Sequence, residues 1–385
     1  MTELDPGGEL RALAADCVHC GFCLPACPTY QLWGEEMDSP RGRIHQITQL
    51  LDGQAGTEAT ALHLDRCLGC MACVPACPSG VRYDRLIEAA RTWAEDPPAA
   101  DSGAPVLPPR GLRDRALRRA IFETFPYPRR LRPLLAPLRA AQRTGAAGRL
   151  GRSKLAGRLV PELAAALRIA PRRRGRLSVL PVRIAARGQR RAVVGMLTGC
   201  VQQVFFPEVN AATARVLAAE GCDVIVPRDQ GCCGALSLHG GRRAEAAAFA
   251  RRVIETFEQA DVDAIVVNAA GCGSAMKEYG ELLAGEPGWA DRAAALAARV
   301  TDFSEFLVRL GPAAPRHPLP LDAVYQDACH LGHAQRITRE PRELLAGIPG
   351  LRIAELGDGG TCCGSAGIYN LVQPEAAAQL GARKA

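Results

Sequence analysis

Several features are scarce in this 385-residue chain, and each shortage excludes a class of protein. No run of 18 apolar residues is present, which argues against a membrane-spanning helix. The first sixteen residues carry four carboxylates and no apolar core, unlike a signal peptide. No Gly-x-Gly-x-x-Gly loop opens a helix and no Walker loop is present. The sequence therefore shows no hydride-transfer site of its own.

Disulfide chemistry is also unexpected. The 16 cysteines are too few, in a chain this long, for a small disulfide scaffold. Free thiolates persist in a reducing compartment. We therefore expect a cytoplasmic protein, and a peripheral position on the inner face of the cell membrane is compatible with this.

Eight cysteines form two copies of one spacing, Cys-x2-Cys-x2-Cys-x3-Cys-Pro, beginning at Cys17 and Cys67. Bacterial ferredoxins with two [4Fe–4S] clusters have this spacing, and the fourth cysteine of each copy ligates the other cluster. The predicted ligand sets are therefore crossed. They are Cys17, Cys20, Cys23 and Cys77 for the first cluster, and Cys67, Cys70, Cys73 and Cys27 for the second.

Structural zinc and disulfides are the alternatives for these cysteines, but zinc sites favour sets without the third cysteine and the Cys-Pro. His19 lies inside the first motif, and we expect it beside the ligands or exposed. Four arginines could offset cluster charge and raise the reduction potential, or could be ordinary surface or docking residues: Arg41, Arg43, Arg66 and Arg82.

The first part of the chain, 1–97, holds both motifs and reads as mainly helical. Ser39 is a candidate N-cap and Pro40 a first helical residue, for a helix that runs to Leu51. A second helix is expected over Val81–Trp93, with its apolar residues on one side.

The second part, 98–190, is a basic connector rich in proline and arginine. Between Asp101 and Arg191 there are 23 Arg or Lys against 4 Asp or Glu, a net of +19, so the rest of the chain carries −12. Short helices are expected near 112–125 and 160–169. Lipid headgroups or an acidic partner protein could meet this segment, or it could simply be solvated. Nucleic acid is not expected, because no binding module is present.

From Arg191 onward, short apolar strands alternate with helices, which predicts an α/β region with parallel sheets covered on both faces. The expected strands are 193–197, 224–226, 264–268 and 323–326. The expected helices are 208–220 and 242–259. We assign 191–310 and 321–385 to two domains.

These two domains share a repeat. A single cysteine follows a strand, and a Cys-Cys-Gly turn comes 32 residues later in the first copy and 33 in the second. Because parallel strands end at one edge, the thiols should converge there. Metal or cluster ligation is one interpretation, and redox-active or merely buried thiols are the others. The cysteines are Cys200, Cys232, Cys233 and Cys272 in the first copy, and Cys329, Cys362 and Cys363 in the second.

A further cysteine and three histidines also belong to this region. Cys222 lies in an expected helix-to-strand turn, where we predict a buried hydrophobic role. His239, His330 and His333 lie near the repeat and could bind an acceptor or take up protons. In the second copy of the repeat, the cysteine that corresponds to Cys272 would fall near residue 402. We therefore expect the sequence to be a C-terminally truncated version of a longer protein. A genuine short variant is the alternative.

Taken together, the motifs resemble those of the iron–sulfur subunit of glycolate oxidase (glycolate dehydrogenase). The matching segments are Cys17–Tyr30, Asp38–Ile44, Cys67–Val81, Leu197–Gln202 and the two Cys-Cys-Gly turns. The resemblance covers essentially the whole chain and is weakest in 98–190. It implies a multidomain fold: a mainly helical two-cluster ferredoxin-like domain, followed by α/β Cys-Cys-Gly domains.

The resemblance also implies a complex in which a separate FAD subunit oxidises the 2-hydroxy acid. This chain would relay electrons toward a membrane quinone or another acceptor, and its Cys-Cys-Gly domains could hold a third iron–sulfur centre. The fullest heterodisulfide-reductase pattern ends in Cys-x2-Cys, whereas Gly273, Ser274 and Ala275 follow Cys272. That difference argues against a heterodisulfide-reductase-like subunit.

Two competing functions remain compatible with parts of the sequence. An anaerobic glycerol-3-phosphate dehydrogenase-like subunit would share the ferredoxin portion. A redox sensor would use the basic connector on nucleic acid, but the lack of a DNA-binding module argues against it. Glycolate and lactate are equally compatible with the sequence as substrates of the complex.

Overall fold

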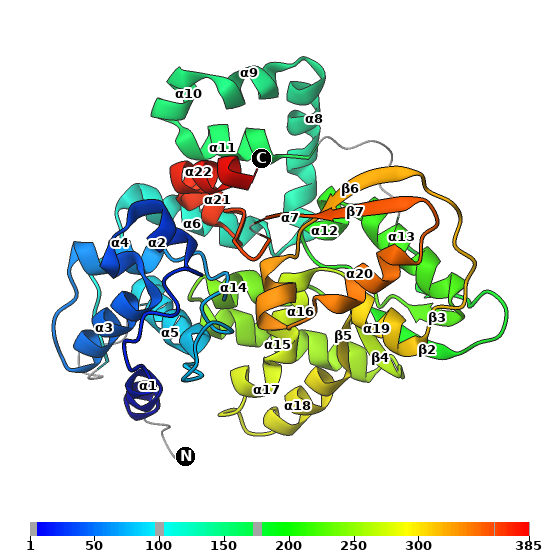
Figure 1. The fold of residues 1–385 in the computed structure, drawn as a ribbon, viewed down its shortest axis with the longest axis horizontal. Helices are drawn as coiled ribbons and strands as arrows, with labels where there is room; N and C mark the ends of the chain where they lie inside the picture. The colour runs from blue at the N-terminus through cyan, green and yellow to red at the C-terminus, as the bar shows by residue number, and fades with distance from the viewer. Residues whose placement is uncertain (1–5, 97–103, 172–178, 358, 385) are drawn as a thin grey trace.

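The computed structural model describes residues 6–96, 104–171, 179–357 and 359–384. Across this part of the chain, an N-terminal group of helices, a helical connector and an α/β region pack side by side (Figure 1). No helix among the described residues is long and apolar enough to cross a membrane.

The N-terminal part contains helices and no strand within residues 6–96, as the sequence predicts. The Ser39 hydroxyl accepts a hydrogen bond from the Gly42 N–H and caps α3, with Pro40 at the first helical position. The apolar faces of α3 and α5 form one core. The elements are α1 (Pro6–Ala15), α2 (Pro28–Trp33), η1 (Glu36–Asp38), α3 (Pro40–Leu51), α4 (Glu58–Asp65) and α5 (Tyr83–Glu95).

The connector is more structured than the two expected helices. It consists of α6 (Leu112–Thr124), α7 (Pro128–Leu131), η2 (Arg132–Leu134), α8 (Leu135–Arg143), α9 (Ala146–Arg152), α10 (Lys154–Leu159) and α11 (Pro161–Ile169). Phe122 is fully buried beneath the Arg242 guanidinium. Helix α11 contacts α21 (Tyr369–Val372) and α22 (Pro374–Lys384). The connector is thus a folded region packed on the α/β part.

A five-stranded sheet organises the first part of the α/β region, in the order β1-β3-β2-β4-β5. The strands are β1 (Arg183–Ile184), β2 (Ala192–Met196), β3 (Cys222–Ile225), β4 (Ala264–Val267) and β5 (Val300–Asp302). All neighbours are parallel except β1, which is an antiparallel edge strand. The sheet therefore begins before residue 191, the boundary that the composition indicates.

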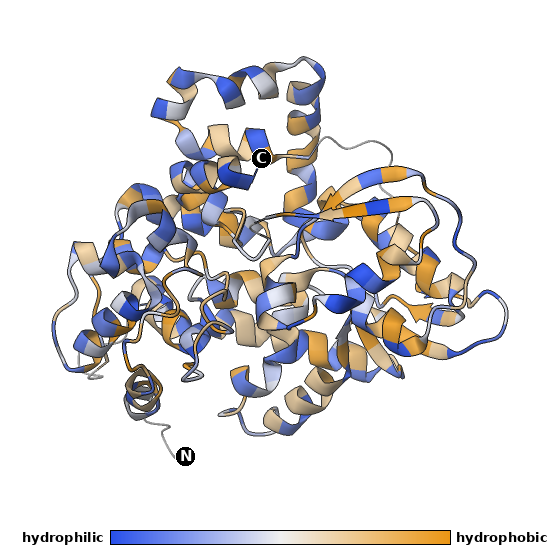
Figure 2. Cartoon of the chain, in the orientation of Figure 1, coloured by the Kyte–Doolittle hydropathy of each residue, from blue (hydrophilic) through white to orange (hydrophobic). Residues whose placement is uncertain are grey.

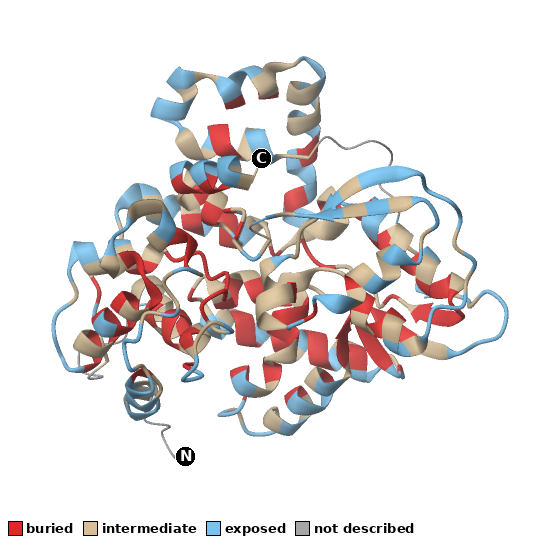
Figure 3. Cartoon of the chain, in the orientation of Figure 1, coloured by how far each residue is buried: buried red, intermediate tan, exposed pale blue. Residues whose placement is uncertain are grey.

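Helices cover both faces of this sheet, as expected for apolar parallel strands. Helices α13 (Pro207–Ala219) and α19 (Phe303–Leu310) pack on one face, and α15 (Arg243–Glu258) is central to the other. Buried residues gather in these layers (Figure 3). The remaining helices are α12 (Gln202–Phe205), α14 (Ala235–His239), α16 (Ala270–Lys277), α17 (Tyr279–Leu282) and α18 (Ala290–Arg299).

The second sheet differs from the prediction. Strands β6 (Leu321–Tyr325) and β7 (Leu351–Glu355) pair in parallel, but neither strand contains a buried residue. Leu321 and Val324 are more than half exposed. Two helices, η3 (His330–Ala334) and α20 (Arg339–Ala346), join these strands, but every residue of both strands is half-buried or exposed. The expectation of a sheet covered on both faces is therefore wrong for this pair.

Candidate iron–sulfur sites

The first predicted ligand set surrounds one cavity near the surface. Cys17, Cys20, Cys23 and Cys77 all line it, and Cys73 of the other set also reaches it. Cys20 is exposed and the other three members are partly buried. The exposed side chains of Val18 and Phe22 flank the cysteine loop. Cysteines from both motifs therefore line this cavity, including Cys77 of the second motif.

The second set surrounds a deeper cavity. Cys27, Cys67, Cys70 and Cys73 line it, and all four are buried. Pro40, Cys73 and Tyr83 line both cavities, so the two lie next to each other. One set is thus open to solvent and the other enclosed.

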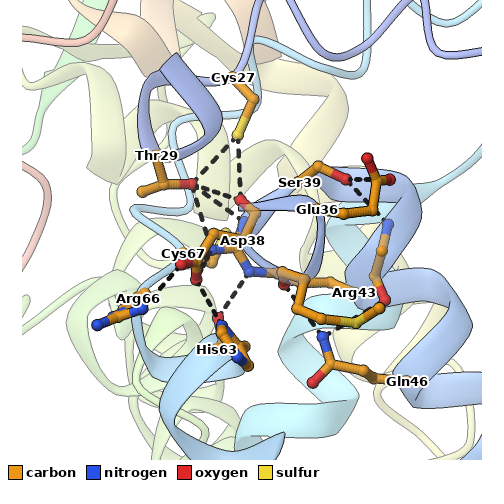
Figure 4. A network of polar contacts seen from close by, with 12 residues as sticks. Cys27, Thr29, Glu36, Asp38, Ser39, Arg43, Gln46, His63, Arg66 and Cys67 are labelled. Atoms are coloured by element: carbon orange, nitrogen blue, oxygen red, sulfur yellow. Dashed lines mark hydrogen bonds and ion pairs between the residues drawn. The ribbon is translucent and has the colours of Figure 1, made fainter. Parts of the chain in front are cut away.

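A buried charge network supports the second cavity (Figure 4). The Arg43 side chain has no exposed surface and donates hydrogen bonds to the Thr29 hydroxyl and the Asp38 carboxylate. Asp38 also contacts His63 at 3.0 Å and Arg66 at 2.8 Å. The network fixes a guanidinium beside the second cysteine set.

The environment of Cys67 favours its thiolate. Burial raises the pKa of the Cys67 thiol, but the charges of Arg43 and Arg91 more than offset this and lower it overall. The Tyr83 hydroxyl at 3.5 Å and the Gly69 N–H at 3.4 Å donate to its sulfur. This is the chemistry that a metal-ligating thiolate requires.

The four arginines that the sequence places near the clusters behave differently. Arg43 lies beside the second set, Arg66 pairs with Asp38, and Arg41 donates to the His19 carbonyl in the first cysteine loop. Arg82 instead pairs with Asp84 and with Glu281 of α17. These pairs favour the other interpretation of Arg82, that of a docking residue. His19 is exposed, as predicted.

The first Cys-Cys-Gly turn meets the cysteines at the ends of β2 and β4. The Cys200 and Cys232 sulfurs are 3.4 Å apart. Cys233 contacts the thiols of Cys232 and Cys272, and these hydrogen bonds lower its pKa well below the usual value. The four thiols therefore converge at one sheet edge, as the strand pattern predicts. Gly234 has φ 82° and approaches the Ala246 backbone, so the turn needs glycine.

The second Cys-Cys-Gly turn brings Cys362 against Cys329 and Cys363. The hydrogen bond from Cys362 lowers the pKa of Cys363 to about 5. Cys362 also contacts the thiol of Cys70, a member of the second ferredoxin-type set. No sequence pattern signals this contact, because the two residues are 292 positions apart and belong to different motifs.

Two further contacts hold this turn to the ferredoxin-like part. The Tyr369 hydroxyl donates to the Arg66 carbonyl at 3.1 Å, and His330 Nε2 lies 3.0 Å from the Gly69 carbonyl. The His330 ring packs on His239, whose Nδ1 lies 2.8 Å from Glu88. His333 contacts only the Gly360 carbonyl among the described residues. Two of the three histidines thus lie together where the parts meet.

All sixteen cysteines are free of disulfides. Among the described residues, no group of three or more His, Cys, Asp or Glu is spaced to hold a single metal ion. Cys222 is fully buried, as predicted, although it begins β3 rather than lying in the preceding turn.

Known protein families match the same parts of the chain. Residues 13–81 match the family described as 4Fe-4S dicluster domain. Residues 194–277 and 323–385 both match the Cysteine-rich domain family, which confirms the internal repeat. The chain is thus an iron–sulfur protein that joins a dicluster domain to cysteine-rich domains.

Residues 113–170 narrow the assignment, because they match the linker region of the glycolate oxidase iron-sulfur subunit. The "Probable glycolate oxidase iron-sulfur subunit" of Bacillus subtilis is 37% identical over 94% of this chain and 80% of its own length. The "Glycolate oxidase iron-sulfur subunit" of Escherichia coli is 36% identical over 96% of this chain and 85% of its own. The chain belongs to the glycolate oxidase iron–sulfur subunit family.

A more distant relative covers half of the chain. "Lactate utilization protein A" of an Exiguobacterium species is 32% identical over 49% of this chain and 77% of its own length. No solved structure matches the chain.

Proposed function

We propose that this chain is the electron-transfer subunit of a glycolate dehydrogenase complex. It would receive electrons from an FAD-containing subunit and pass them toward quinone or another acceptor. The two cysteine-lined cavities, which share Cys73 and Tyr83, support this most directly, because they lie next to each other, as two centres that exchange electrons would have to. The names of the relatives point to glycolate as the donor substrate of the complex.

Each cavity would hold one [4Fe–4S] cluster, with the crossed sets as ligands: Cys17, Cys20, Cys23 and Cys77 in the outer one, Cys67, Cys70, Cys73 and Cys27 in the inner one. When bound, such clusters accept and release single electrons, which lets a two-electron flavin oxidation proceed in one-electron steps. The residues fit this role, because burial and the neighbouring cysteines Cys70 and Cys67 raise the pKa of Cys73, as expected for thiols that need a cation among them.

The side chains around the inner set and those around the outer set would have different roles. Arg43 keeps one permanent positive charge beside the inner set, because Tyr83, the thiols of Cys67 and Cys27, and Asp38 raise its pKa despite burial. Positive charge near a cluster raises its reduction potential. The outer set lies at the surface, where Cys20, Val18 and Phe22 are exposed. We propose this face as the side that meets the flavin subunit.

The first Cys-Cys-Gly set would supply four further ligands, Cys200, Cys232, Cys233 and Cys272, for a third iron–sulfur centre. Its convergent thiols support this, and redox-active thiols without iron are the alternative. The second set offers three cysteines, Cys329, Cys362 and Cys363, and lies against the inner ferredoxin-type set.

Iron and acid-labile sulfide in anaerobically purified protein, with the EPR spectrum of the reduced form, test this proposal. About eight irons per chain and two interacting signals are expected if the ferredoxin-type sets alone are loaded. About twelve would place a third centre in the Cys-Cys-Gly region, and Cys232→Ser should then remove only that signal. Zinc in place of iron would overturn the electron-transfer role.

The substrate assignment needs the assembled complex. Reduction of a soluble dye by glycolate, compared with lactate, would test it with the flavin subunit present. If quinone is the acceptor, the proposal includes a peripheral contact of this chain with the membrane, because quinone is dissolved in the bilayer.

A further inference from the structure

The outer end of the connector exposes an unusual amount of apolar surface. We call residues Arg149–Val160, on α9 and α10, the tip. Within it, Leu155 is 66% exposed, Leu159 64%, Leu150 48% and Val160 41%. Helices α9 and α10 lie at the edge of the molecule and are largely exposed (Figures 1 and 3). Clustered large apolar side chains in water mark an interaction surface.

The tip is also strongly basic. All of its charged side chains are cations, and all are exposed: Arg149, Arg152, Lys154 and Arg158. Between Glu123 and Glu208 the chain contains a single carboxylate, Glu162, and that group pairs with Arg113 at 2.7 Å. No acidic side chain of the tip itself is present to neutralise its cations.

Helix α10 arranges the two kinds of residue in adjacent rows. Leu155 and Leu159 are one helical turn apart and share a face. Lys154 and Arg158 form a second row with the same spacing. The alternation of polar and apolar residues along α9 and α10 is visible in Figure 2. This is the pattern of a helix that lies in a membrane interface, where basic side chains extend toward the headgroups.

The composition fits lipid better than a protein partner. No aromatic residue occurs from Pro128 to Ala170. Protein interfaces take much of their binding energy from Trp and Tyr, which are absent here, whereas Leu, which forms the apolar surface of the tip, is under-represented among the dominant residues. An anionic bilayer offers phosphates to several dispersed cations and an apolar layer to leucines.

We propose that the tip docks this chain on an anionic phospholipid bilayer, with Leu155 and Leu159 in the interface and the four cations on lipid phosphates. The proposal deepens the proposed function and rests on it for its purpose, because a quinone acceptor is dissolved in the same bilayer. The surface itself is defined without reference to the electron donor.

Co-sedimentation of the anaerobically purified full chain with vesicles tests this directly. We expect binding to phosphatidylcholine vesicles that contain phosphatidylglycerol, weak binding to phosphatidylcholine alone, and release by salt. Arg152→Gln with Arg158→Gln should weaken binding about tenfold or more, since each cation near an anionic surface contributes about fivefold. Leu155→Ser with Leu159→Ser should weaken it even at low salt.

Matched controls use exposed residues elsewhere. Val324→Ser removes an apolar side chain that is 60% exposed on β6, and Arg119→Gln removes a cation that is 78% exposed on α6. Both should bind vesicles as the unaltered chain does. The proposal is overturned if the unaltered chain ignores anionic vesicles, if the controls lose as much binding as the tip variants, or if tip variants lose a partner subunit while vesicle binding is unchanged.

The failure of this proposal is distinguishable from failure of the proposed function. Dye reduction by glycolate in the assembled complex needs no membrane, so tip variants should retain it. If the unaltered complex reduces no dye but the chain still binds anionic vesicles through the tip, the electron-transfer role fails and the membrane surface stands.

Discussion

Arg43 is the residue on which the inner cysteine set depends most. It is a fully buried cation bonded to Thr29, to Asp38 and to the His63 carbonyl. Removing one member of such a network leaves the others desolvated without a partner. The charge that favours the Cys67 thiolate is therefore also a structural element of the N-terminal part.

We predict that Arg43→Met lowers the free energy of unfolding by about 3–5 kcal/mol, because Asp38 then stays buried with less positive charge around it. Denaturant unfolding under anaerobic conditions measures this. Arg119→Met breaks only the surface pair with Glu123 and should change the same free energy by about 0.5 kcal/mol or less. Equal effects of the two substitutions would contradict the structural importance of Arg43.

Cys362 gives a second prediction at this scale, since its thiol touches that of Cys70. In the structure, the Cys362 thiol donates to Cys363 and accepts from Cys70. A cluster-bound Cys70 would have no proton to donate, so the Cys362 thiol would then donate to the Cys70 sulfur, and Cys362→Ala should lower the reduction potential of the inner centre. The expected shift is about 20–65 mV, equivalent to a hydrogen bond of about 0.5–1.5 kcal/mol for one electron. Redox titration followed by EPR measures it.

The matched control is Cys232→Ala, at the equivalent position of the first Cys-Cys-Gly turn, which should leave the potentials of both ferredoxin-type centres unchanged. The sign of the Cys362 effect is informative. A rise in potential would mean that an anion had been removed, so that Cys362 is itself a metal-bound thiolate rather than a hydrogen-bond donor.

At the scale of elements, the turn from η1 into α3 explains why particular residue types occupy the Asp38–Ile44 segment. Asp38 enters the buried network, Ser39 caps the helix, and Gly42 passes the Glu36 carbonyl so closely that a Cβ there would lie 2.0 Å from its oxygen. Sequence rules could predict the cap and the helix. They could not predict the close approach, which depends on how η1 folds back onto α3.

Gly42→Ala should therefore destabilise the protein by about 1–3 kcal/mol, despite the higher helix propensity of alanine, because the backbone of η1 must move. Gly157→Ala on α10 has no atom within 4 Å of the new Cβ and should stabilise by up to about 1 kcal/mol. Thermal unfolding of both variants tests the contrast, and a stabilised Gly42→Ala would show that η1 packs less tightly than the structure indicates.

Elements were predicted best where local chemistry decides the structure. The helices α3, α5 and α15 and the strands β2 and β4 follow from periodicity and caps, and the cysteine-lined cavities follow from spacing. The antiparallel edge strand β1 is only two residues long and carries no periodic signal. Strand β6 was expected at 323–326, but its exposure was not, because a short apolar strand looks the same whether or not helices cover it. Strand β7 (Leu351–Glu355) was not predicted.

At the scale of the whole molecule, the junction between the ferredoxin-like part and the first cysteine-rich part is held by charges. Arg82 and Arg85 of α5 both pair with Glu281 of α17, and Arg91 donates to the His239 carbonyl at 2.8 Å. No local sequence pattern specifies these pairs, because each joins residues more than a hundred positions apart. They fix the relative placement of the cysteine sets.

One carboxyl group at this junction, that of Glu278, is buried where its ionised form is disfavoured. Glu278 follows α16, and burial raises its pKa to about 7, with a further contribution from the charge of Glu88. The groups facing it are Asp84 and Glu88 of α5, His239 of α14 and Glu281 of α17. Three carboxylates therefore oppose its ionisation and His239 favours it.

Because the pKa of Glu278 is raised in the folded chain, this group makes stability fall as pH rises. From about pH 4.5 to pH 7 the folded chain keeps a proton on Glu278 that the unfolded chain has lost, so the stability contribution of this group falls as pH rises through that window. Above pH 7 the loss is complete and constant. The Glu278→Gln variant carries no group that can ionise at this position. It should raise the free energy of unfolding only slightly at pH 5, and by roughly 2 kcal/mol more at pH 8 than at pH 5.

Unfolding midpoints of the two proteins at both pH values measure this difference. Glu258→Gln is the control, because its partner Arg292 lowers the pKa of Glu258 and the substitution should bring no gain at pH 8. A Glu278→Gln effect of the same size at pH 5 and pH 8 would mean that Glu278 is already ionised in the folded chain. In that case the junction would be more open to water than the burial of Glu278 implies, and the two cysteine-bearing parts would be less firmly joined.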